Sequence, residues 1–167
     1  TWKDLPVDRR QFLKLLSRFE LTVEQAAKLY EEGARKRAGW GGTDREIVEN
    51  PYRIYELSRH DPEGIRLLTV DRGVFPDDAV RLVHPLGAPS CLESGVDRRR
   101  VRAFSLAALE KAALDGHTLQ SRDGLVEAIR AFAVKPECAV TGDILRAQLS
   151  TMAPEIVPAP LDDDQGL

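Results

Sequence analysis

The sequence has few of the residues from which disulfide scaffolds and metal sites are built. Its 167 residues include two cysteines, three histidines and one methionine. Cys91 and Cys138 are too few for a disulfide framework and lack metal-ligand spacing, so we interpret them as small apolar residues of a reducing, cytoplasmic protein, with a disulfide as the less favoured alternative. His60, His84 and His117 lie in three separate segments, which argues against a metal site.

Long apolar runs and an excess of one charge are also absent. No run approaches the roughly 18 residues that span a membrane, and no signal peptide opens the chain, so we expect no membrane partner. The formal net charge of −3 excludes a strongly basic nucleic-acid tail, although it permits a local basic patch. Because the first residue is Thr1 and not Met, we expect a piece of a longer protein.

Motifs for nucleotide chemistry are missing as well. The glycine-rich loop Gly39-Trp-Gly-Gly-Thr43 lacks the Gly-Lys-Ser/Thr that a phosphate-binding P-loop needs. No serine sits in a nucleophile-elbow pattern, and the carboxylates are dispersed over caps and exposed faces. We therefore expect no catalytic residue, no metal ligand and no cofactor in this chain.

Most of the other sequence patterns predict helices. Capping boxes begin at Asp8, Thr22 and Thr43, each followed three residues later by Gln or Glu. They predict helices over residues 9–19 and 23–37 and a third that begins after Thr43. Residues 101–114 are apolar nearly all round, which is typical of a central buried helix. Caps for this helix and two later ones are expected at Asp97, at Ser121 or Asp123, and at Thr141.

The other segments are less regular. Residues 65–70 fit a short helix or a strand, and Asp71-Arg72-Gly73 predicts a turn. Further predictions are a short helix from Pro76 to Val83, an irregular connection over 85–95, and a strand over 155–158 followed by a hairpin turn at 162–166.

A break in the helical pattern occurs at Asn50-Pro51. Pro51 disfavours the helical region for Asn50 and suits the first position of a new helix. Tyr52 and Tyr55 then give this second helix an aromatic anchor. We interpret these four residues as a structural anchor of the fold.

Two basic clusters are the strongest signals for a ligand. Arg35-Lys-Arg37 closes a predicted helix, where cations meet the negative end of the helix dipole, so no partner is needed to explain it. Arg98-Arg-Arg-Val-Arg102 opens a helix, where positive charge is mildly unfavourable. Acidic side chains of a neighbouring helix and a phosphate backbone remain the two explanations of this second cluster.

Several phrases follow one another in an order typical of one family. Leu21-Thr-Val-Glu-Gln-Ala-Ala-Lys-Leu-Tyr30 resembles the first helix-hairpin-helix segment ahead of the motor in RecD-like DNA helicases. Glu49-Asn-Pro-Tyr-Arg53 is similar to their Glu-Asn-Pro-Tyr phrase. Arg99-Arg-Val-Arg-Ala103 and Gly116-His-Thr-Leu119 resemble their Arg-Ile-Arg-Ala helix and Gly-His-Thr signature. The resemblance covers most of residues 21–149.

The resemblance implies a mainly α fold with little β structure. This multi-helix bundle would have a helix-hairpin-helix-like region over 1–95 and a central helix with a winged-helix-like segment over 96–167, or one continuous domain. One departure concerns a hairpin that is Gly-Ile-Gly-Phe in the family and keeps only Gly64-Ile65 here. Such glycines let hairpin amides approach a phosphate closely.

For function, the resemblance implies an accessory region that binds and positions DNA in repair or recombination, without catalysis of its own. The expected partners are single-stranded or forked DNA and the parent chain's motor domains, which would lie beyond Leu167 and hold ATP and magnesium. Candidate backbone contacts, salt-sensitive in kind, are Lys28, Arg35, Arg98, Arg99 and Arg102. The alternative is a protein–protein docking module without nucleic-acid contact.

Overall fold

The computed structural model describes residues 1–159, and helix is the regular secondary structure of this part of the chain. It contains ten α-helices and two short 3-10 helices, and no strand is present between residues 1 and 159. The predicted mainly α, multi-helix fold class is therefore confirmed. No helix in the same range has both the length and the apolarity needed to cross a bilayer.

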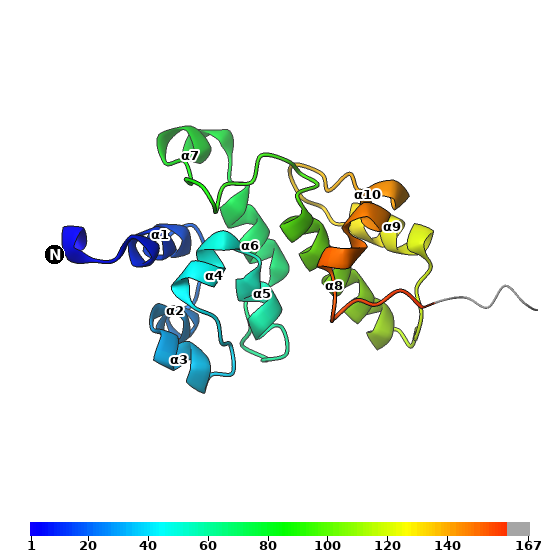
Figure 1. Cartoon of the computed structure of the whole chain (residues 1–167), viewed down its shortest axis with the longest axis horizontal. Coiled ribbons are helices and arrows are strands. Elements are labelled where there is room, and N and C mark those ends of the chain that lie inside the picture. The colour runs from blue at the N-terminus through cyan, green and yellow to red at the C-terminus, as the bar shows by residue number, and fades with distance from the viewer. Residues whose placement is uncertain (160–167) are drawn as a thin grey trace, which may run out of the picture.

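The N-terminal half is built from short helices around two hairpins. Its elements are η1 (Trp2–Asp4), α1 (Val7–Leu16), α2 (Val23–Tyr30), α3 (Glu32–Arg37), α4 (Asp44–Glu49), α5 (Arg53–Ser58), α6 (Leu67–Val74) and α7 (Asp78–Val83). Helix α1 packs on α4, α2 packs on α3, and α5 contacts both α4 and α6. Figure 1 shows α7 at the outer edge of the molecule, away from the other helices of this half.

The C-terminal half is organised around one long helix. Its elements are α8 (Arg98–Leu114), α9 (Arg122–Arg130), α10 (Gly142–Gln148) and η2 (Leu149–Thr151). Helix α8 lies between the α5–α6 pair on one side and α9 and α10 on the other (Figure 1). Val101, Ala103 and Phe104 are fully buried, which confirms the prediction of a central helix. Buried side chains of both halves form one hydrophobic cluster.

Most predicted helix starts are confirmed by their caps. Side-chain oxygens of Thr22, Thr43, Asp97, Ser121 and Thr141 each accept a hydrogen bond from a backbone amide in the first turn of α2, α4, α8, α9 and α10. The start of the first helix was predicted wrongly. Helix α1 begins at Val7 after Pro6, which makes no side-chain cap. Asp8 therefore lies inside the first turn and does not cap it.

The predicted single helix over 23–37 is in fact two helices. Helix α2 ends at Tyr30, and Glu31 has an extended backbone (φ −115°, ψ 140°) before α3 begins. This residue resets the helical phase. As a result Tyr30 is 53% exposed and Arg35 is 0% exposed, the reverse of what one continuous amphipathic helix predicts.

The turn predicted at Asp71-Arg72-Gly73 is also wrong, because these residues lie within α6. Asp71 is held inside the protein by charged and polar partners. Gly73 is required by packing, since a β-carbon at this position would lie 2.3 Å from Cδ1 of Phe19. Two residues that usually mark a turn thus serve tertiary contacts, Asp71 with Arg100 of α8 and Gly73 with Phe19. The choice left open for 65–70 is resolved as helix from Leu67 onward.

The C-terminal segment departs from the predicted strand. Residues 155–158 form a turn, a bend and irregular backbone instead, and the hairpin turn expected at 162–166 lies outside the described residues. The short helix α7 and the irregular connection over 85–95 agree with prediction. The winged-helix-like assignment of residues 96–167 stays a prediction.

Candidate nucleic-acid interface

The side chain of Arg35 is buried and hydrogen-bonded inside the protein. Its Nη2 donates to Oδ1 of Asp44 at 2.6 Å, and its Nε donates to the Gly42 carbonyl at 3.0 Å. The guanidinium lies 4.8 Å from the centre of the Phe12 ring. With 0% of the residue exposed, its charge cannot reach a phosphate. Arg35 is therefore removed from the candidate DNA contacts.

Lys28 is also paired, in this case with the tip of the second hairpin. Its ammonium lies 3.0 Å from Oδ2 of Asp61, which also accepts a hydrogen bond from the indole of Trp40 at 2.9 Å. The amide of Glu63 first, and then Lys28, hold the pKa of the Asp61 carboxyl below its usual range. The ion pair is partly exposed, so Lys28 would have to leave Asp61 to bind a phosphate.

The second hairpin, residues 59–66, is fastened to its neighbours. Nε2 of Gln25 donates to the carbonyls of Glu63 and Gly64 at 3.1 and 3.4 Å. The amide of Ile65 donates to the hydroxyl of Ser58. Its tip carries the carboxylates of Asp61 and Glu63, and anions repel a phosphate. This hairpin thus presents acidic side chains where the resemblance implies glycine amides.

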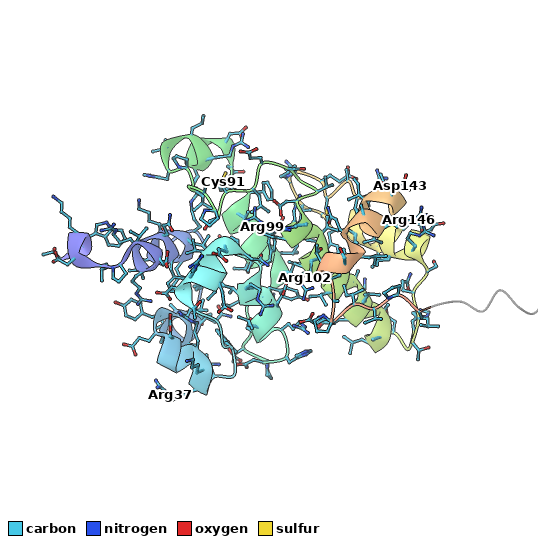
Figure 2. The ribbon with its side chains drawn as sticks, viewed as in Figure 1. Arg37, Cys91, Arg99, Arg102, Asp143 and Arg146 are labelled. Carbon is cyan, nitrogen blue, oxygen red and sulfur yellow. The ribbon has the colours of Figure 1, made fainter. Side chains whose placement is uncertain are left out.

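In the cluster 98–102, most of the charge is used within the protein. Arg100 is fully buried. Arg102 pairs with Glu56 at 3.2 Å and with Glu155 at 2.6 Å. Arg99 pairs with Asp97 at 2.9 Å and donates to backbone carbonyls, including that of Glu49 at 2.8 Å. Acidic and carbonyl partners thus account for three of the four arginines. In the view of Figure 2, Arg99 and Arg102 lie over the middle of the molecule.

Arg98 differs from its neighbours. It is the first residue of α8 and is exposed. It forms no ion pair with any residue between 1 and 159. Of the five basic residues predicted to contact DNA, Arg98 is thus the one whose charge faces solvent without a protein partner in the described part of the chain.

The predicted anchor residues Asn50, Pro51, Tyr52 and Tyr55 form the junction of α4 and α5, and Tyr55 also contacts the C-terminal half. The amide of Tyr52 donates to Oδ1 of Asn50 at 3.1 Å, which fixes the turn around the buried Pro51. The Tyr52 hydroxyl donates to Asp71 at 2.6 Å, and the Tyr55 hydroxyl donates to Glu110 of α8 at 2.9 Å. Burial and the neighbouring carboxylates raise the pKa of both phenols. The two tyrosines therefore make their contacts within the protein core.

The first hairpin, residues 36–43 at the junction of α3 and α4, holds two cations of the 35–37 cluster that were not among the predicted DNA contacts. Lys36 and Arg37, the last residues of α3, are exposed and make no ion pair within residues 1–159. Figure 2 shows Arg37 at the edge of the molecule. After them, Gly39, Gly41 and Gly42 have φ values of 75°, 44° and 79°, the left-handed region that favours glycine. If the sequence had signalled the helix break at Glu31, it would have shown which residues of the 35–37 cluster are exposed.

The amides of this hairpin are partly free. Those of Gly39 and Trp40 donate to carbonyls of α3, whereas those of Gly41 and Gly42 donate to no acceptor in the described residues. Asp44, the nearest carboxylate along the chain, turns inward to Arg35. Free amides and exposed cations are the groups that bind a phosphate.

An open groove of about 300 Å³ lies between α8 and α9. Alanines and Phe132 line much of it, and Lys111, Asp115 and His117 line the remainder. Within residues 1–159, no group of three or more His, Cys, Asp or Glu side chains is arranged to hold a metal ion.

Comparisons with protein-family models, with curated proteins and with solved structures find no match to this chain.

Proposed function

We propose that this chain is an accessory, non-catalytic helical region of a RecD-like DNA helicase, in a cytoplasmic setting, which contacts the DNA backbone weakly and positions the strand for motor domains elsewhere in the parent chain. The observation that carries the DNA contact is the first hairpin. It combines two exposed cations, Lys36 and Arg37, with the free amides of Gly41 and Gly42. Arg98 adds a further exposed cation at the start of α8.

Backbone binding of this kind is independent of sequence and sensitive to salt. The experiment is fluorescence anisotropy of the chain with a forked DNA at about 50 and 200 mM salt. The variant Lys36→Glu/Arg37→Glu is compared with Lys111→Glu/Arg146→Glu, whose cations are also exposed and make no ion pair in residues 1–159. Both variants change the net charge equally.

We expect the wild type to bind at low salt and the hairpin variant to lose at least tenfold in affinity, since each charged hydrogen bond contributes about 1.5–3 kcal/mol. The control variant should lose much less. Absence of binding at low salt, or equal losses in both variants, would count against a DNA contact at the hairpin.

The second candidate function is a docking module, and exposed apolar residues on α7 favour it. Leu82 and Val83 are 79% and 70% exposed, and α7 has no buried residue. The partner would be the parent chain's own motor domains. Titration calorimetry of this chain with those domains would test it, with Leu82→Asp/Val83→Asp expected to abolish binding and Leu114→Asp, at another exposed leucine, expected to preserve it.

A further inference from the structure

A small niche lies between α1 and the connection that follows α7. Its volume is about 120 Å³, and its lining includes Gln11 and Lys14 of α1 together with Leu86 and Gly87 of the connection. At ~30 Å³ per water molecule, this space holds a group of a few non-hydrogen atoms. The niche is separate from the hairpin on which the proposed function rests.

The connection crosses α1 in the opposite direction, and two hydrogen bonds fix this register. Nε2 of Gln11 donates to the Ala88 carbonyl at 3.3 Å, and Nη2 of Arg18 donates to the His84 carbonyl. Lys14 of α1 lies between Gln11 and Arg18 in the sequence, opposite the middle of the crossing segment. Gln11 lines the niche at one end, and at the other end Arg18 holds the carbonyl of His84, the residue before the niche-lining Pro85.

The cations at this place have no counter-ion in the described residues. Neither Lys14 nor Arg18 forms an ion pair between residues 1 and 159. Nη1 of Arg18 is buried and has no hydrogen-bond partner there. An unpaired, buried guanidinium nitrogen is costly, and burial lowers the pKa of Arg18. An acceptor anion beside it would remove this cost.

Backbone donors complete the site. The amides of Leu86 and Gly87 donate to no acceptor within residues 1–159. A β-carbon added at Gly87 would meet no atom within 4 Å, so the niche is open on this side. The Lys14 ammonium, Nη1 of Arg18 and two free amides are thus donors without an acceptor in the described residues.

We propose that this niche between α1 and residues 84–88 binds a phosphodiester group of a DNA strand through Lys14, Arg18 and the amides of Leu86 and Gly87. A phosphate offers several acceptor oxygens, so Nη1 of Arg18, the Lys14 ammonium and the two amides can each donate to one. The inference deepens the proposed function and rests on it. It adds a second backbone contact, independent of the first hairpin.

The test has two measurements on the whole chain. In the first, the ¹⁵N–¹H spectrum is recorded while inorganic phosphate replaces chloride at constant ionic strength. We expect saturable shifts at Leu86 and Gly87 in the wild type. The phosphate affinity derived from these shifts should fall at least tenfold in Lys14→Ala/Arg18→Gln, because the variant removes both positive charges.

The second measurement is anisotropy with the forked DNA. The same variant should bind about tenfold more weakly, as expected for the loss of charge-assisted hydrogen bonds, and the slope of log affinity against log salt should fall by about 0.7–0.9, the contribution of one phosphate. The control is Lys111→Ala/Arg146→Gln, which removes the same two residue types elsewhere and should change neither value. If the double variant unfolds by circular dichroism, Lys14→Ala alone replaces it, since Lys14 is exposed.

The outcomes separate this inference from the proposed function. DNA binding that is weakened by the hairpin variant but unchanged by the niche variant overturns the niche as a DNA contact and leaves the proposed function standing. Absence of DNA binding overturns both, even if free phosphate shifts the two amides. Absence of saturable phosphate shifts overturns the niche as an anion site.

Discussion

Arg100 of α8 and Asp71 of α6 form a buried bidentate salt bridge. Nε of Arg100 lies 2.8 Å from Oδ1, and Nη2 lies 2.9 Å from Oδ2. The Tyr52 hydroxyl donates to the same Oδ1 at 2.6 Å, and Nη2 also donates to the Pro136 carbonyl at 2.7 Å. Burial acts to lower the pKa of Arg100, but Asp71 outweighs it and the pKa is raised. This buried salt bridge thus connects the N-terminal and C-terminal halves of the fold.

The first prediction concerns Asp71→Asn. The substitution leaves the Arg100 charge buried without a counter-ion, a change that typically costs about 3–5 kcal/mol. We expect the free energy of unfolding, measured by urea denaturation with circular dichroism, to fall by this amount. Asp78→Asn is the matched control, because its ion pair with Arg81 is exposed and such pairs contribute about 1 kcal/mol or less. Equal losses in both variants would show that the Asp71–Arg100 pair does not stabilise the fold.

The second prediction concerns Arg35→Ala. Asp44 keeps Arg9 at 3.3 Å but loses its closest partner, and the ring of Phe12 loses the stacked guanidinium. We expect a loss of about 3–5 kcal/mol for a broken buried pair, with the melting temperature lowered by roughly 2–4 °C per kcal/mol. Arg37→Ala, two residues further on and exposed, should melt like the wild type. A wild-type melting temperature for Arg35→Ala would contradict the assigned role.

These two arginines also mark what sequence reasoning could and could not predict. The cap residues Thr22, Thr43 and Asp97 act over one helical turn, so local sequence suffices to place the helices they begin. The orientation of Arg35 depends on one extended residue, Glu31, which no local signal identifies. The prediction of one continuous helix over 23–37 therefore placed Arg35 on its exposed face. As a result, a core residue was predicted to contact DNA.

Tertiary partners explain the remaining differences. Asp71 and Gly73 have the composition of a turn, yet α6 places the carboxylate against Arg100 and the glycine against Phe19. Both partners are distant in sequence. In the same way, the sequence alone could not decide whether acidic partners within the protein or a bound phosphate explain the basic cluster 98–102. The structure supplies acidic partners to its arginines except Arg98, and those carboxylates come from Glu56, Asp71, Asp97 and Glu155.

The third prediction concerns Gly64 of the second hairpin. A β-carbon at Gly64 would lie 2.1 Å from the carbonyl oxygen of Ser58, a backbone atom that cannot move without opening the hairpin. We therefore expect Gly64→Ala to destabilise the fold by about 1–3 kcal/mol, the range for overpacked sites. Gly87→Ala is the control, since its added carbon meets no atom within 4 Å. Equal urea midpoints for the two variants would exclude this close approach.

The fourth prediction is a loss of stability at alkaline pH. Burial raises the pKa of the Cys138 thiol from 9.0 to about 11. Between these values the unfolded chain releases the proton while the native chain keeps it, so the unfolded state binds fewer protons. The free energy of unfolding then falls as pH rises, by at most about 2–3 kcal/mol for a shift of this size. The raised pKa values of Tyr52 and Tyr55 act in the same direction at higher pH.

The measurement is the urea midpoint at pH 8 and pH 10.5 for the wild type and for Cys138→Ala. The variant loses some packing at both pH values because Cys138 is fully buried, so the informative quantity is the change between the two pH values. We expect a smaller change in the variant, since it lacks the titrating thiol. Cys91→Ala, at the exposed cysteine, should keep the wild-type change. If all three proteins lost the same stability between pH 8 and 10.5, the Cys138 thiol would not be a source of the alkaline sensitivity.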